Sequence, residues 1–251
     1  MVKNFLKKVI PTPIRQKIRK TEARIFCPDR QYRHLSTECV FEEIYRNGIW
    51  GRDDQGFPIS GLGSHTARIV EPYVKAVAKI VNDHSLKTGV DLGCGDFAVG
   101  SRIYGLFEQF TACDISKTIL DINRETYRDP SLDFRKLDLT TDDLPQADIA
   151  FLRQVLQHLS NNNIDAFVKK VNNDNKFKFL LVTEHIPAAT NFSPNIDKPN
   201  EPGIRTIFDS GIFLHEASFN LIYKKSQEIL SIDDGASGKQ RFLIKSTLYE
   251  F

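Results

Sequence analysis

The chain has 251 residues, of which 41% are hydrophobic and 26% are charged, and its formal net charge is +2. This composition is ordinary for a soluble globular protein with one large core, so we expect one α/β domain with extensions. No apolar run approaches the roughly 20 residues that span a bilayer and no signal peptide is visible at Met1, so we expect a cytoplasmic protein. The four cysteines contain no CxxC pair, which argues against a zinc knuckle or a disulfide framework.

The positive charge is concentrated at the amino terminus. Residues 1–35 contain ten Lys and Arg against two acidic residues, a net charge of +8, whereas the rest of the chain carries −6. We therefore expect a basic amphipathic arm at residues 1–40, followed by one domain at 41–251. The arm either contacts an anionic membrane surface through residues 1–20, at the inner face of the membrane, or packs on the domain as a solvated helix. No basic cluster with interleaved aromatic residues follows it, so no nucleic acid partner is expected.

The segment at residues 41–68 is rich in glycine. Residues 42–68 contain five glycines and the only tryptophan of the chain, Trp50. This composition is typical of a loop that folds over a ligand, and glycine-rich backbone can accept a carboxylate through its N–H groups. The alternative is a structural tryptophan that anchors a loop. Residues 66–83 then carry apolar residues at helical spacing and predict a helix that leads into the first strand.

A nucleotide-binding turn is predicted at residues 88–101. A short apolar run contains Asp91 and ends at Gly93-Cys-Gly95, and glycines at such a turn let the backbone approach a ligand closely. Asp114 closes the next apolar run, at the distance where an acid binds both hydroxyls of a ribose. The pattern indicates a ligand that contains adenosine. Three interpretations of this turn remain open. Gly93, Gly95 and Ala98 match the loose fingerprint of dinucleotide-binding proteins, whereas Asp91, Gly93 and Gly95 match a pattern in which an acidic residue precedes the two glycines, called the acid-first pattern below. The third interpretation is a strand-to-helix turn that binds no ligand.

Further apolar runs alternate with helical patterns along the chain. They predict strands at residues 110–114, 132–138, 147–152 and 177–182, and helices at 116–127 and from 153–159 onward. Residues 221–232 and 241–251 predict two antiparallel strands joined by a glycine-containing turn. The expected fold is an α/β, doubly wound, mostly parallel seven-stranded Rossmann-like sheet with an antiparallel carboxyl-terminal hairpin and an amino-terminal helical extension. In such sheets ligands bind at the carboxyl ends of the strands.

The acid-first pattern Asp91-x-Gly93-x-Gly95 resembles motif I of the class I S-adenosylmethionine-dependent methyltransferases, with Phe97 in place of a frequent third glycine. The resemblance covers residues 88–185 and the hairpin, about half of the chain. A longer pattern, which includes Ile49-Trp-Gly, Ser60-Gly-Leu-Gly-Ser and Arg153-Gln-Val-Leu-Gln-His, resembles a bacterial subgroup associated with surface-glycan or capsule biosynthesis.

The resemblance implies S-adenosylmethionine as cofactor, S-adenosylhomocysteine as product and no need for a metal. It places Asp91 at the methionine amino group and Asp138 near the adenine amino group. The expected cofactor-binding residues are Trp50, Gly51, Ser60, Gly61, Asp91, Gly93, Gly95, Asp114, Ile115, Asp138, Leu139 and Gln154.

Methyl transfer to a hydroxyl requires alignment and benefits from a general base. His158 and His185 are the candidate bases, and Arg153 and Gln154 lie at the tip of the fourth strand. The alternative for each histidine is a structural role or a position beside the cofactor without a part in the reaction. The expected acceptor is an oxygen of a small polar molecule, a sugar or glycan precursor. The competing hypotheses are an NAD-dependent oxidoreductase and a non-catalytic adenosine-binding protein.

A long polar segment is expected to hold the acceptor. Residues 187–210 are proline-rich, and the substrate loop is predicted to extend over 187–218. An anionic acceptor would be held by cationic side chains and oriented by neighbouring polar ones, although ordinary solvated charges explain the pattern equally well. The candidate substrate-binding residues are Glu184, Asn195, Asp197, Lys198 and Arg205.

Overall fold

The computed structural model describes residues 30–189, 191–235 and 241–251, so most of the expected arm at 1–40 lies outside the described residues. The elements, in chain order, are η1 (Arg30–His34), α3 (Thr37–Asn47), α4 (Leu62–His65), α5 (Ala67–His84), β1 (Thr88–Leu92), η2 (Gly100–Arg102), η3 (Tyr104–Leu106), β2 (Gln109–Asp114), α6 (Lys117–Thr126), β3 (Leu132–Lys136), β4 (Ala147–Arg153), η4 (Leu156–His158), α7 (Asn161–Asp174), β5 (Phe177–Pro187), η5 (Arg205–Phe208), β6 (Lys225–Asp233) and β7 (Phe242–Glu250). None of the described helices is long and apolar enough to cross a membrane.

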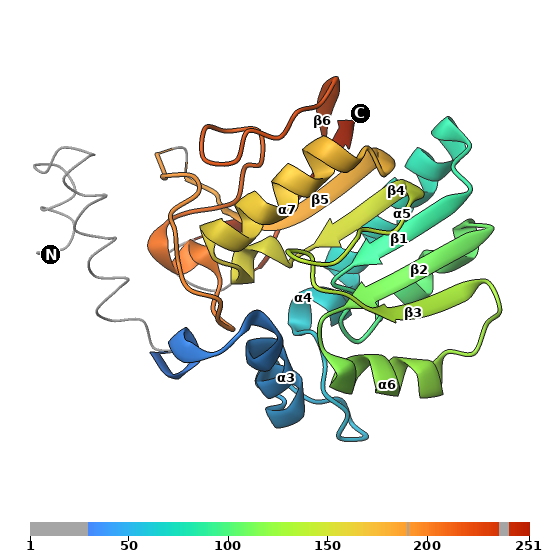
Figure 1. Cartoon of the computed structure of the whole chain (residues 1–251), viewed down its shortest axis with the longest axis horizontal. Helices are drawn as coiled ribbons and strands as arrows, with labels where there is room; N and C mark the ends of the chain where they lie inside the picture. The colour runs from blue at the N-terminus through green and yellow to red at the C-terminus, as the bar shows by residue number, and fades with distance from the viewer. Residues whose placement is uncertain (1–29, 190, 236–240) are drawn as a thin grey trace, which may run out of the picture.

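Seven strands form one sheet in the order β3-β2-β1-β4-β5-β7-β6. The first five strands pair in parallel, whereas β7 pairs antiparallel with both β5 and β6. The predicted fold class, a mostly parallel seven-stranded sheet with an antiparallel terminal hairpin, is therefore confirmed. In Figure 1 the arrows of β2, β3 and β4 point toward the side of the molecule where α3 and α4 lie.

Each face of the sheet carries its own apolar cluster, because successive strand residues point to opposite faces. Val90 and Leu92 of β1 belong to the cluster that includes α3 and α7, with Phe167 fully buried. Phe110 and Ala112 of β2 belong to the cluster on the other face, which includes α5 and α6. Helices on both faces make the sheet doubly wound, and the strand ends remain available for a site.

The amino-terminal boundary differs from the prediction. The helix α3 begins at Thr37, with Ser36 as its N-cap, so the expected boundary at residue 40 lies inside a helix. Tyr32, in the predicted arm, is buried in the main cluster. The expected loop at 42–68 is also partly helical, because the apolar face of α3 continues to Tyr45 and the helix ends only at Gly48, whose left-handed φ of 62° caps it.

The prediction of a helix that begins within residues 153–159 is wrong. Gln154 adopts a left-handed φ of 58°, which ends β4 without starting a helix. A short η4 turn follows, and α7 starts only after Ser160, whose side chain accepts a hydrogen bond from the Asn163 backbone N–H. This irregular turn carries the polar side chains of the candidate site.

Candidate functional site

A cavity of about 270 Å³ lies at the carboxyl ends of the parallel strands. Its walls come from the β1 loop, the ends of β2, β4 and β5, and the segment from α3 to α5. Fourteen of the sequence-predicted site residues line it: Trp50, Ser60, Gly61, Asp91, Gly93, Gly95, Asp114, Ile115, Asp138, Leu139, Arg153, Gln154, His158 and His185. Six predicted residues do not: Gly51, Glu184, Asn195, Asp197, Lys198 and Arg205.

The β1 loop needs its glycines. Gly93 and Gly95 have φ values of +88° and +55°, and a Cβ at Gly95 would lie 2.1 Å from Ser60 Oγ. Asp114 fixes the loop, because its Oδ2 accepts a 2.9 Å hydrogen bond from the Gly95 N–H and its Oδ1 accepts one from the Ser116 N–H. The carboxylate expected to bind a ribose therefore also shapes the turn that faces it.

Phe97 accounts for the departure from the three-glycine pattern. Its φ is 59°, in the left-handed region, and its ring is fully buried against Tyr127 and Phe134. The space that its ring needs comes from Gly100, where an added Cβ would lie 2.2 Å from the Phe97 ring. Burial of a large aromatic side chain thus stabilises a turn that usually requires glycine.

The carboxylates at the strand ends are suited to a cation. Burial raises the pKa of Asp91 to about 7, although nearby Arg153 opposes this shift. Burial also raises the pKa of Asp114 to about 6, against the opposing effect of backbone hydrogen bonds from Ser116, Gly95 and Ile115. A buried carboxylate with a raised pKa gains most from an added positive charge, and the ammonium of S-adenosylmethionine is such a charge. Asp91 and its glycine turn therefore fit this cofactor.

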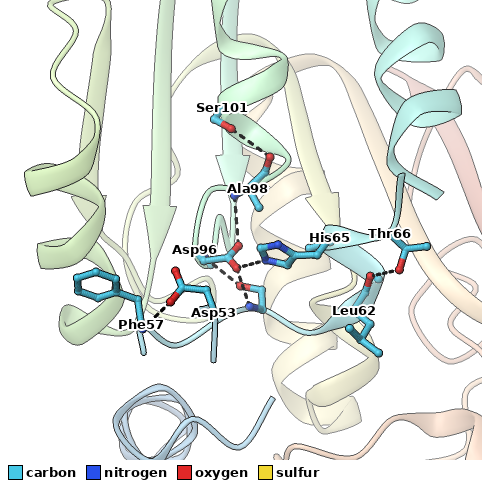
Figure 2. A network of polar contacts seen from close by, with 12 residues as sticks. Asp53, Phe57, Leu62, His65, Thr66, Asp96, Ala98 and Ser101 are labelled. Atoms are coloured by element: carbon cyan, nitrogen blue, oxygen red, sulfur yellow. Dashed lines mark hydrogen bonds and ion pairs between the residues drawn. The ribbon is translucent and has the colours of Figure 1, made fainter. Parts of the chain in front are cut away.

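A polar network joins the segment before α5 to the β1 loop. Asp96 Oδ2 contacts His65 Nε2 at 2.6 Å and accepts a 2.8 Å hydrogen bond from the Ser60 N–H. In return, Ser60 Oγ accepts from the Asp96 N–H at 2.9 Å and lies 3.1 Å from the Tyr45 hydroxyl. Figure 2 shows the His65 ring and the Asp96 carboxylate pointing toward each other. Sequence reasoning missed Asp96 and His65, because only the fold brings these residues together.

The His65 and Asp96 contact predicts a pH dependence of stability. The hydrogen bond to Asp96 raises the pKa of His65 above 6.5, so the folded protein binds the proton more tightly than the unfolded chain does. The stability that the pair contributes is fully present below pH 6.5 and is lost as the pH rises through the folded pKa. We expect the difference in unfolding free energy between wild type and His65→Gln, measured by urea denaturation, to shrink over this range. His34→Gln, at an exposed position on η1, is the control. A difference between wild type and His65→Gln that does not change with pH would contradict the prediction.

Four polar side chains converge where β4 and β5 end. The Arg153 guanidinium donates to the Gly63 carbonyl, to Ser64 Oγ and to Gln154 Oε1. Gln154 Nε2 then lies 3.0 Å from His185 Nδ1, and Gln157 Oε1 lies 3.0 Å from the same nitrogen. Burial and Arg153 lower the pKa of His185 to about 4, with Asp234 opposing them, so His185 is neutral at pH 7.

His158 has different surroundings. Its ring is buried and packs on Trp50, with the ring centroids 4.8 Å apart. Burial and the Lys198 ammonium lower its pKa to about 3, so it too is neutral. Trp50 is held in place by its indole N–H, which donates to the Pro202 carbonyl. The two candidate bases are therefore distinct, since His158 belongs to an aromatic wall and His185 to a polar cluster.

The structure corrects the prediction that Lys198 and Arg205 bind an anionic acceptor, because both side chains are buried. Arg205 is fully buried and donates to the carbonyls of Ile196 and Leu159, while Lys198, also buried, donates to the His158 carbonyl and pairs with Glu201. These cations cross-link the segment after β5 to the η4 turn. They lie inside the fold because the carbonyls they satisfy are buried there.

The three remaining substrate candidates are structural as well. Glu184 accepts hydrogen bonds from the backbone N–H groups of Leu156 and Gln157, Asn195 pairs with the Phe213 backbone, and Asp197 accepts from the N–H of Asn161 at the start of α7. Gly51, expected at the cofactor, instead contributes a turn, since a Cβ there would meet Ile59. Sequence reasoning also missed cavity-lining Tyr73, Phe41 and Thr37, whose spacing in the sequence carries no motif, and it gave no role to Gln157, although this residue lies within the quoted pattern at 153–158.

Comparisons with known proteins give the family of the central region. Residues 90–173 match the family model described as a methyltransferase domain. This central third of the chain is therefore similar to a methyltransferase domain. No curated protein sequence matches the chain significantly.

Solved structures agree with this fold. Human N-acetylserotonin methyltransferase, in complex with S-adenosylmethionine, is similar with a TM-score of 0.57 and 17% identity over 95% of this chain and 67% of its own. The N-methyltransferase NodS from Bradyrhizobium japonicum, in complex with S-adenosylhomocysteine, has a TM-score of 0.56 and 9% identity over 84% of this chain and 98% of its own. Magnesium protoporphyrin IX methyltransferase from Synechocystis has a TM-score of 0.52 and 11% identity over 86% of this chain and 98% of its own.

At the level of domain and fold, the predicted enzyme class, an S-adenosylmethionine-dependent methyltransferase, is confirmed. The structural neighbours include an N-methyltransferase, so the fold does not select the acceptor atom. Within residues 30–189, 191–235 and 241–251, no group of three or more His, Cys, Asp or Glu is arranged to hold a metal ion.

Proposed function

We propose that this protein transfers the methyl group of S-adenosylmethionine to a hydroxyl oxygen of a small, polar, uncharged acceptor, a sugar or glycan precursor. The observation that carries the proposal is one cavity that joins buried Asp91 and Asp114 to a neutral histidine, His185. When bound, the cofactor supplies an electrophilic methyl group on a sulfonium. Asp91 would hold its ammonium, Asp114 its ribose and Asp138 its adenine.

The residues of this chain would perform two tasks in the reaction. The walls from the β1 loop and the segment at 50–66 hold the reactants in line and exclude water, and such positioning contributes up to roughly 7–11 kcal/mol. His185 accepts the proton of the acceptor hydroxyl as the new carbon–oxygen bond forms, and later releases it to solvent. A positioned general base contributes up to about 10²–10⁴ in rate when its pKa lies near the working pH, and the lowered pKa of His185 keeps its ring neutral and free to accept the proton.

The charge of the cavity favours an uncharged acceptor. Arg153 is the only Lys or Arg among the described residues that line the cavity, and its guanidinium already has three partners there. Trp50 contributes apolar surface to the cavity wall, and Thr37 contributes a hydroxyl. The glycan-precursor assignment rests on this lining together with the longer sequence pattern described above.

Two experiments test this function. Calorimetry should detect binding of S-adenosylhomocysteine and none of NAD or NADH; binding of NADH alone would overturn the cofactor assignment. Transfer of a labelled methyl group to a panel of neutral sugars, nucleotide sugars and uronates should then select a neutral hydroxyl. Transfer only to amines or only to uronates would contradict the acceptor class.

A further inference from the structure

We propose that Gln157 is a positioning residue that keeps the proton of neutral His185 on Nδ1, so that Nε2 is the ring nitrogen that accepts the substrate proton. The inference rests on the proposed function for its catalytic meaning. Its geometric basis is the set of hydrogen-bond partners around one nitrogen.

The amide orientations of both glutamines are fixed by their other partners. Gln157 Oε1 accepts a 3.2 Å hydrogen bond from the backbone N–H of His185, so the atom facing that residue must be the oxygen. Gln154 Oε1 accepts a 2.9 Å hydrogen bond from the Arg153 guanidinium, which has no acceptor, so its nitrogen faces His185. His185 Nδ1 therefore has an acceptor and a donor at equal distances of 3.0 Å.

One ring nitrogen of a neutral histidine satisfies only one of these partners. If Nδ1 were bare, it would accept from Gln154, and its lone pair would face the Gln157 oxygen. If Nδ1 carries the proton, it donates to Gln157, and the Gln154 amide turns a proton toward it. The difference lies in burial, because Gln157 is only 4% exposed whereas Gln154 is partly exposed to the cavity. Facing lone pairs at the buried Gln157 oxygen would be costly, whereas the half-buried Gln154 amide lines the cavity and bears the poorer contact at a lower cost.

The charged groups around His185 do not reverse this preference. Arg153 at the end of β4 and Asp234 after β6 act on its pKa in opposite directions, and burial is the largest effect on it. The ring is neutral at pH 7, and both glutamines contact Nδ1. Nε2 is then the nitrogen left for the acceptor, as a lone pair rather than as an N–H. Gln157 also lies next to His158, 3.3 Å from its Nε2, and so links the two histidines.

Nitrogen NMR of the full-length protein labelled with ¹⁵N in its six histidines tests the inference without cofactor or acceptor. His185→Gln identifies the signals. At pH 7 we expect a protonated Nδ1 and a bare Nε2 for His185. Gln157→Leu should move the proton to Nε2, since Gln154 then remains as the only partner. Gln154→Leu should leave the proton on Nδ1, and Gln227→Leu, exposed on β6, is the control that changes nothing.

A second variant separates positioning from folding. Gln157→Glu keeps an oxygen opposite Nδ1 and adds a negative charge, so we expect the Nδ1 proton to remain and the pKa of His185 to rise. A protonated Nε2 in the wild type, or an unchanged tautomer in Gln157→Leu, would overturn the inference. If the tautomer is as expected but His185→Gln retains full methyl transfer, the base assignment fails and the positioning result stands.

Discussion

Replacing Arg205 by leucine should lower the free energy of unfolding by about 3–5 kcal/mol, the usual cost of removing one partner from a buried charge cluster. The guanidinium is fully buried, donates to the carbonyls of Ile196 and Leu159, and lies near the carboxylates of Asp197, Glu184 and Glu201. The variant leaves these two buried carbonyls without their donor and removes one cation from beside the three carboxylates, of which Glu201 keeps its pairing with Lys198.

Urea unfolding followed by the fluorescence of Trp50, the only tryptophan, measures this effect. Arg135→Leu is the control, since Arg135 is an exposed residue of β3 paired with Asp133, and such pairs contribute about 1 kcal/mol or less. An Arg205→Leu protein with wild-type stability and a raised KM for an acceptor would instead restore the substrate-binding role that the sequence suggested.

The strand ends were predictable because their pattern is local. Asp91, Gly93 and Asp114 follow apolar runs of strand length, and parallel strands bring their carboxyl ends to one edge, so sequence position alone places them at a common site. The terminal hairpin was predictable for the same reason, because a glycine-containing turn separates two runs of strand length.

The loop charges were not predictable because burial depends on tertiary structure. Lys198 and Arg205 lie in a polar, proline-rich segment that reads as a surface loop, yet both side chains fold inward to satisfy backbone carbonyls at residues 158, 159 and 196. Asp96 and His65 were overlooked for the converse reason. They are 31 residues apart in the chain, and only the packing of the covering segment on the β1 loop brings them together.

The cofactor assignment makes the strongest prediction for binding. Asp114→Ala should weaken the affinity for S-adenosylhomocysteine about 10²-fold or more. The change would remove the two proposed charge-assisted ribose hydrogen bonds, worth about 1.5–3 kcal/mol each, and leaves the N–H groups of Gly95 and Ser116 without their acceptor. Asp114→Asn should be intermediate, because its one amide oxygen keeps an acceptor for only one of these groups.

Calorimetry with S-adenosylhomocysteine, together with circular dichroism to verify folding, measures the effect of Asp114→Ala. Asp121→Ala is the matched control, since Asp121 lies on α6, outside the cavity wall, and its partly exposed carboxylate accepts hydrogen bonds from the side chains of Lys117 and Arg124. Because both backbone groups belong to the turn that faces the cavity, a folded Asp114→Ala protein with wild-type affinity would show that neither the ribose contact nor the shape of the Gly95 turn contributes to binding. The adenosine would then have to be held from the β3 side of the cavity, where Asp138 and Leu139 form the wall.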